Sequence, residues 1–146
     1  MRTPTSPQQA VTVRVFVRRF AATRLGARTA RLAAVGQLAD WGVARDTDVS
    51  DVVSVIVGEL TANAATHGKV PGRDFELRLL LGPGTLCVEV SDTRGEVRPP
   101  CPGEIPVPAP ESESGRGMVL VAALADRWSV TDRVPVGKTV RAEVDL

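Results

Sequence analysis

The spacing of apolar residues separates strand-like from helix-like segments along the chain. Residues 11–20, VTVRVFVRRF, carry a valine at every second position at their start, which is the period of a β-strand. Residues 24–40 change to helical spacing, with Thr23 placed to accept a hydrogen bond at the helix N-terminus and Gly42 close to its end. The inner side of this helix is expected to carry Leu25, Leu32, Val35 and Leu38.

A second helix is predicted from about residue 48 to Gly68. Asp48 or Ser50 is a candidate for the N-cap, and Gly68 is a typical residue for ending a helix. One broad face of this helix is apolar and is expected to face the core. That face comprises Val52, Val53, Ile56, Val57, Leu60 and Ala64.

The second half of the chain reads as a hairpin, a long loop, a helix and two further strands. The loop, residues 93–114, contains six prolines and has no periodicity, and a loop of this length is often a functional lid. The order of elements predicts an α+β protein, a two-layer α/β sandwich with a mostly antiparallel mixed sheet covered on one face by three helices. The segments are 74–82 and 85–92 for the hairpin, 115–126 for the helix, and 127–134 and 138–146 for the last strands.

Length and charge narrow the class of protein. A chain of 146 residues with 43% hydrophobic content fits one domain, here residues 11–146, preceded by a flexible tail at residues 1–10. The 18 basic residues are balanced by 17 acidic ones, so the overall charge gives no indication of nucleic-acid or membrane binding. Neither a signal peptide nor a membrane span is evident, and Cys87 and Cys101 do not suggest a disulfide framework, so we expect a cytoplasmic protein.

Three polar residues form a stripe along the second helix. Glu59, Asn63 and His67 are spaced by four residues, which places them on one helical face. Asn63 offers an oxygen ligand of the kind that Mg²⁺ prefers, and Glu59 is a candidate to orient or deprotonate a hydroxyl nucleophile. A solvent-facing polar stripe would account equally well for Glu59 and Asn63 alone, and His67 also fits as a residue that favours the helix C-terminus.

Two further motifs carry chemistry that complements this stripe. Asp92 stands at the end of a predicted strand, where a carboxylate can accept a hydrogen bond from an exocyclic amino group, and Gly95 would let the backbone approach a flat ring. The sequence GRG, residues 115–117, opens a helix whose free backbone N–H groups favour an anion such as phosphate. Taken singly, each of these two motifs is also common in proteins for purely structural reasons.

The order of these motifs, with a long loop between the last two, resembles the nucleotide-binding boxes of the Bergerat-fold (histidine-kinase-like) ATPases. More narrowly, ELTANAATHG, VEVSD, GRGMVLVAALADRW and GKTVRAEVDL resemble the small anti-sigma-factor serine kinases, in their actinobacterial type. The resemblance extends over roughly residues 11–146. It implies an ATP-dependent protein serine/threonine kinase with ATP and Mg²⁺ as cofactors, and it identifies the loop at 93–114 as the ATP lid.

The resemblance also assigns roles to individual residues. Glu59 would be the catalytic carboxylate, Asn63 would coordinate Mg²⁺, and Asp92 would bind the adenine amino group with Gly95 lining the base. Further cofactor-binding positions are His67, Gly115, Arg116 and Gly117, and Thr139, which would support the adenine contact from a neighbouring strand.

Partners follow from the same resemblance. Proteins of this type bind a sigma factor, phosphorylate a serine on an anti-anti-sigma (STAS-domain) protein and commonly form homodimers, with no direct contact to nucleic acid or membrane. Two departures leave an alternative open, because Arg94 stands where the wider superfamily often has glycine and the lid is rich in proline. The alternative is a non-catalytic nucleotide-binding module of the same fold that interacts with proteins.

Overall fold

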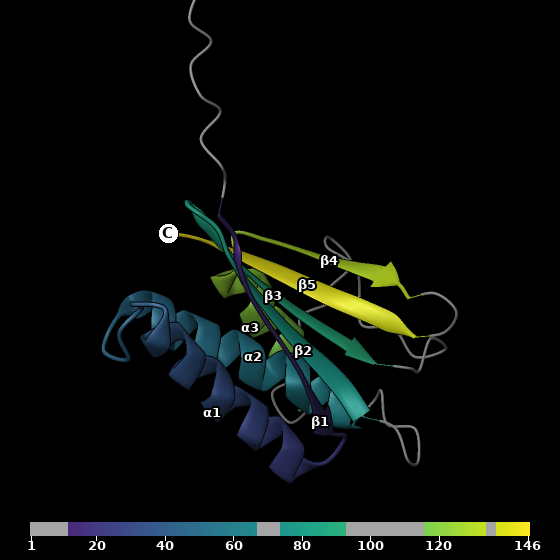
Figure 1. Cartoon of the computed structure of the whole chain (residues 1–146). Coiled ribbons are helices and arrows are strands. Elements are labelled where there is room, and N and C mark those ends of the chain that lie inside the picture. Colours follow the sequence, from purple (N-terminus) through teal and green to yellow (C-terminus); the bar gives the residue numbers. More distant parts are fainter. Residues whose placement is uncertain (1–11, 67–73, 93–115, 134–136) are drawn as a thin grey trace, which may run out of the picture.

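The computed structural model describes residues 12–66, 74–92, 116–133 and 137–146 (Figure 1). The predicted tail, lid, Gly68, His67, Gly95 and Gly115 lie outside these residues, as does Cys101. In chain order the elements are β1 (Arg14–Ala21), α1 (Arg24–Asp40), α2 (Asp48–Thr66), β2 (Asp74–Leu81), β3 (Thr85–Asp92), α3 (Arg116–Leu124), β4 (Arg127–Asp132) and β5 (Lys138–Asp145).

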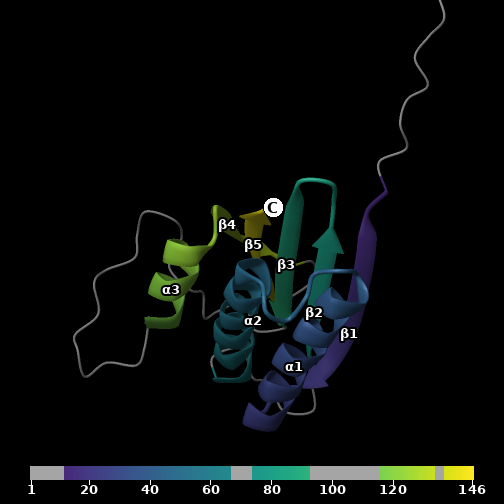
Figure 2. The same ribbon diagram turned by 90° about the vertical axis from the view of Figure 1, so that its left-hand side faces the viewer.

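The described strands form one five-stranded sheet in the order β1-β2-β3-β5-β4, and the helices lie together on one side of it (Figures 1 and 2). The expected α+β sandwich is therefore confirmed. Every pairing between the described strands is antiparallel, so this part of the sheet is not mixed. The core lies between the layers, where Phe75, Leu77 and Leu79 of β2 pack with the buried faces of the helices.

Strand β1 forms one edge of the sheet, and its inward and outward faces carry different residues. Phe20 is buried and stacks on Phe75 of β2, with the ring centroids 5.9 Å apart. Val15 and Val17, on the other side of the strand, are 55% and 47% exposed. The valine periodicity thus predicted the strand correctly, but phenylalanines rather than valines anchor it to the core.

Helix α1 begins at the predicted N-cap, where Thr23 Oγ1 accepts a hydrogen bond of 2.9 Å from the backbone N–H of Gly26. The predicted inner face was wrong in part, because Leu25 and Leu32 are 73% and 57% exposed. Small residues face the core instead and let α2 approach closely, since interaxial distance depends on side-chain size at the contact. The buried residues of α1 are Gly26, Ala27, Ala30, Ala34 and Leu38.

Helix α2 lies between the other two helices and contacts both. The cap differs from the two predicted candidates, because Thr47 Oγ1 accepts from the backbone N–H of Ser50 at 3.3 Å. The buried face agrees with the prediction at Val53, Ile56, Val57, Leu60 and Ala64, and Val52 is only partly buried. Thr61 is also buried and donates to Val57 O at 2.6 Å, while lying 3.4 Å from Ala27 O of α1.

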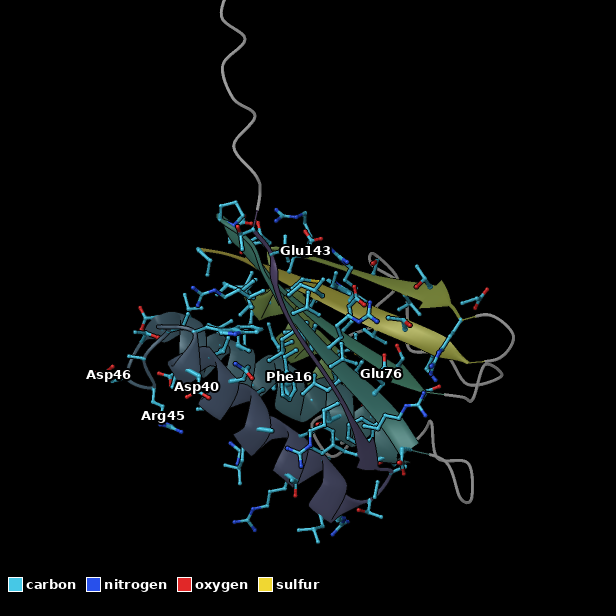
Figure 3. The ribbon with its side chains drawn as sticks, in the orientation of Figure 1. Phe16, Asp40, Arg45, Asp46, Glu76 and Glu143 are labelled. Carbon is cyan, nitrogen blue, oxygen red and sulfur yellow. The ribbon has the colours of Figure 1, made fainter. Side chains whose placement is uncertain are left out.

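Charged side chains lie on both layers of the fold. Figure 3 shows Asp40, Arg45 and Asp46 around the α1–α2 connection and Glu76 and Glu143 over the strands. None of the described helices has the length and apolar content needed to cross a bilayer.

Candidate nucleotide site

The predicted site residues Glu59 and Asn63 lie on the flank of α2 that faces away from α1. Gly58 and Thr61 mark the flank that faces α1, because a Cβ at Gly58 would lie 3.2 Å from Arg31 Cδ and Thr61 approaches Ala27 O. Helical periodicity puts Glu59 and Asn63 on the opposite side of the buried face, toward α3. Both side chains are partly buried. Glu59 and Asn63 therefore lie on the side of α2 on which α3 packs (Figure 2).

The elements that carry the predicted motifs end or begin at the same end of the molecule. The C-terminal end of α2, the end of β3, the start of β5 and the first turn of α3 lie there together (Figure 2). The sheet register agrees, because Asp92 at the end of β3 is paired with Lys138 at the start of β5. Segments that are distant in sequence thus bring Asn63, Asp92 and the start of α3 to one end of the fold.

Asp92 is a buried carboxylate with a buried cationic partner. It is 5% exposed, and its Oδ2 lies 2.9 Å from Nζ of Lys138, which is 4% exposed. Both side chains are on the helix-facing side of the sheet, since they alternate with outward-facing Ser91 and Thr139. A buried carboxylate held by an ammonium is an acceptor for hydrogen bonds, which is the chemistry that an exocyclic amino group requires.

Thr139 is placed differently from the other predicted residues. Its Oγ1 lies 2.7 Å from Ser91 Oγ, and the two hydroxyls link β5 to β3 on the face of the sheet away from the helices. This contact lies directly behind the Asp92–Lys138 pair. If Thr139 supports the binding of a base, it would therefore do so indirectly, by fixing the positions of β3 and β5.

The first turn of α3 carries the second and third residues of the GRG motif. Arg116 and Gly117 are its first residues, and Met118, which is 2% exposed, anchors the turn in the core. The first N–H groups of a helix have no intrahelical acceptor, so this turn presents donors suited to phosphate. The backbone of the GRG motif is therefore consistent with its predicted role from Arg116 onward, while Gly115 lies outside the described residues.

The described residues offer few ligands for a metal ion. No group of three histidine, cysteine, aspartate or glutamate side chains among them is arranged to hold one. Mg²⁺ usually takes only one or two oxygen ligands from a protein, with phosphates and water completing its shell. Asn63 is the candidate oxygen ligand, and Glu59 lies one turn earlier on the same flank.

The outward face of β4 and β5 carries a separate charge network that lies away from this site. Arg127 Nε donates to Glu143 Oε2 at 2.6 Å, and its NH1 donates to Asp145 Oδ2 at 3.2 Å. Hydrogen bonds from Arg127 lower the pKa of the Glu143 and Asp145 carboxyls, and Arg141 adds to the effect on Glu143. These groups hold the outer edge of the sheet and are not part of the site.

Comparison with known proteins agrees with this arrangement of motifs. Residues 3–144 match the family model described as the histidine kinase-like ATPase domain. This chain belongs to that family. No curated protein sequence matches it significantly.

Among solved structures, the histidine kinase-like domain is similar to a crystal structure of the RsbU and RsbW domains of Rv1364c from Mycobacterium tuberculosis. The TM-score is 0.64 at 19% sequence identity. The match covers 90% of this chain and 32% of that one, so the domain spans about a third of the chain it resembles. At this identity the similarity supports the fold.

Lys138 is a further residue of the candidate site, and none of the sequence motifs indicated it. A signal was present in the sequence, because β5 alternates and Lys138 occupies the same face as the buried residues Val140, Ala142 and Val144. A charged residue in register with core positions is expected to have a buried partner. Which partner it has depends on the pairing of β5 with β3, which a reading of single motifs does not provide.

Proposed function

We propose that this domain is an ATP-binding protein serine kinase that also acts as an anti-sigma factor. The observation that carries the proposal is the buried Asp92 carboxylate at the end of β3, at the same end of the fold as the Asn63 flank and the first turn of α3. Membership of the histidine kinase-like ATPase family supports ATP as the ligand.

The site residues have distinct roles in this proposal. Asp92 accepts a hydrogen bond from the adenine amino group and so selects the base. Asn63 supplies an oxygen to the Mg²⁺ that neutralises phosphate charge, and the first turn of α3 donates backbone N–H groups to phosphate oxygens. Glu59 orients and deprotonates the serine hydroxyl of the protein substrate. The further proposed binding residues are His67, Gly95, Gly115, Arg116, Gly117 and, through strand pairing, Thr139.

The proposed partners are a sigma factor and an anti-anti-sigma protein with a STAS domain, which carries the target serine. Support comes from the motif resemblance to actinobacterial anti-sigma-factor kinases and from the similar fold of a chain that includes an RsbW domain. We also propose a cytoplasmic homodimer. Size-exclusion chromatography with light scattering, with and without a candidate sigma factor, would measure both associations.

A second candidate function is a non-catalytic module in which bound nucleotide stabilises a surface for protein partners. It is favoured by Arg94 in the second motif, where a bulky cation replaces a residue that is often glycine in the wider superfamily. The two functions differ in one measurable product. Only the kinase releases ADP in amounts that depend on the presence of the protein substrate.

Calorimetric titration with ATP and ADP, with and without Mg²⁺, tests the site on which both functions depend. Saturable binding of ATP that Mg²⁺ strengthens is expected for the wild-type chain. Asp92→Asn is expected to weaken it by at least about tenfold, because the amide replaces one acceptor oxygen and removes the charge. Absence of saturable binding to a folded wild-type chain would contradict the proposal.

A further inference from the structure

Lys138 makes a contact that stability alone does not account for. Both charges of the Asp92–Lys138 pair are almost fully withdrawn from water. Desolvation offsets most of the attraction in such pairs, and apolar residues of similar size are often as stabilising or more so. Val140 and Ala142, which follow on the same face of β5, show that this face accommodates apolar residues.

The surroundings of Lys138 place it between two carboxylate-bearing strands. It is in register with Asp92 on β3 and with Asp132 on β4, so the three residues form a row across the ends of three adjacent strands. Asp132 is exposed, whereas Asp92 is buried. The ammonium therefore lies at the boundary of the core, where it fixes the buried carboxylate from the side opposite β2.

The bond to Lys138 determines what Asp92 can recognise. An ionised carboxylate only accepts hydrogen bonds, and each of its two oxygens can accept more than one, so the bond from Nζ to Oδ2 does not exclude a further donor. The same bond fixes the orientation in which the carboxylate is presented. The oriented carboxylate complements a base with an amino donor and opposes a base with a keto oxygen.

We propose that Lys138 is a positioning residue that determines base specificity. By holding Asp92 as an oriented, ionised acceptor, it makes the site select a base with an exocyclic amino group over the corresponding keto base. This inference rests on the proposed function, because it concerns the same nucleotide site. It assigns to Lys138 a role that acts through Asp92 and requires no contact with the base.

The experiment compares ATP with inosine triphosphate, which has a keto oxygen in place of the adenine amino group. Affinities of both are measured by calorimetry on the full wild-type chain, Lys138→Met and Lys138→Arg, and circular dichroism checks that each variant is folded. The wild type is expected to prefer ATP by at least about tenfold, because the keto base places an acceptor oxygen against Asp92 where the adenine amino group would donate.

Lys138→Met is expected to lower this preference to about threefold or less, mainly through weaker ATP binding, because Asp92 loses the contact that holds it in one orientation. Lys138→Arg keeps a cation beside Asp92 and is expected to restore the preference. The double variant Asp92→Asn/Lys138→Met removes both charges and provides a folded reference if Lys138→Met alone is unstable. In that reference the preference is also expected to be lost, since an amide presents both a donor and an acceptor.

The outcomes separate this inference from the proposed function. Wild-type selectivity for ATP that persists in folded Lys138→Met would overturn the inference and leave the proposed function intact. Selectivity that persists in the double variant as well would also show that Asp92 does not select the base. Equal weakening of both nucleotides in Lys138→Met would do the same, because it would indicate only structural support. No binding of either nucleotide to the folded wild type would overturn the proposed function and the inference with it.

Discussion

The hydroxyls of Ser91 and Thr139 lie 2.7 Å apart and join β3 to β5 on the outward face of the sheet. On the inward face, at the next position of β3 and the preceding position of β5, Asp92 is paired with Lys138. The two contacts therefore fix the same pair of strand ends from opposite sides. The outer one is neutral, and the inner one is an ion pair within the candidate nucleotide site.

Removing the hydroxyl of Ser91 or that of Thr139 is expected to lower stability and ATP affinity to the same extent. Ser91→Ala and Thr139→Val should each reduce the free energy of unfolding by about 1 kcal/mol, the usual net contribution of one hydrogen bond. ATP binding should weaken about two- to threefold in both, because each change loosens the strand ends behind Asp92 without touching the inward face. Urea unfolding and calorimetry measure the two quantities. A tenfold greater loss of affinity in Thr139→Val than in Ser91→Ala would instead indicate that Thr139 contacts the nucleotide directly.

Glu59→Gln is expected to separate binding from phosphoryl transfer. The amide keeps the size of the side chain but cannot accept a proton, and general-base catalysis typically contributes a factor of about 100 to 10,000. We therefore expect serine phosphorylation to slow at least about 100-fold, with ATP affinity within about threefold of the wild type. Transfer of radiolabelled phosphate to the substrate protein provides the rate.

Asp51→Asn is the matched control for Glu59→Gln, because Asp51 is an exposed acid near the other end of the same helix. It should leave both affinity and transfer unchanged. If Glu59→Gln transferred phosphate at the wild-type rate, Glu59 would have no catalytic role. If the wild type itself released no ADP in response to the substrate protein, the non-catalytic alternative would be favoured.

Cys87 is expected to be unreactive in the native protein. Burial raises the pKa of its thiol from 9.0 to about 11; Arg141 opposes the shift, and Glu89 and Glu143 add to it. A difference of about two pH units makes the thiolate about 100-fold scarcer than in the unfolded chain near pH 8. Alkylation by iodoacetamide in a Cys101→Ser variant should be slower by about that factor than in denaturant. Equal rates would show that the thiol is accessible and ionises normally.

The same shift has a consequence for stability at high pH. Because the folded pKa is raised, the neutral thiol favours the native state below about pH 9, and this contribution disappears as the pH rises through about 11. Native stability should therefore decline over that interval. A Cys87→Ala variant, which has no thiol to ionise, should show a smaller decline in parallel urea titrations.

Periodicity and capping were sufficient to predict the order of elements. Thr23 lies at the predicted cap of α1, and the hairpin of β2 and β3 has the predicted strands, because both depend on neighbouring residues. The inward face of α1 was mispredicted at Leu25 and Leu32. Apolarity favoured these leucines, but the close contact with α2 selects the smaller residues of α1, and that selection depends on tertiary packing.

The candidate site was predictable only where a motif lies within one segment. Glu59 and Asn63 share a flank of α2 because helical spacing alone determines that relationship. Lys138 was not identified as a partner of Asp92, because the pairing requires that β5 lies beside β3, whereas the next strand after β3 along the chain is β4. Strand order is a property of the whole sheet, so the cation of the site emerged only from the structure.

Gly26 is expected to be the least replaceable glycine among those of α1 and α2. A Cβ at this position would lie 1.8 Å from the backbone oxygen of Ala21, at the end of β1, so a side chain would force apart the strand and the first turn of the helix. Backbone atoms cannot move aside as a flexible side chain can, and overpacking a tight contact costs a few kcal/mol. Gly26→Ala should therefore reduce the free energy of unfolding by at least about 3 kcal/mol.

Gly58→Ala is the matched control, because Gly58 also lies in a helix and its added Cβ would meet only the side chain of Arg31, at 3.2 Å. Alanine favours the helical conformation by about 1 kcal/mol over glycine, so this variant should be as stable as the wild type or slightly more stable. Urea unfolding of both variants provides the comparison. The Gly26 contact joins α1 to the sheet, and α1 in turn supports the flank of α2 opposite Glu59. Similar stabilities of the two variants would therefore show that α1 is not held against β1 as closely as the structure indicates.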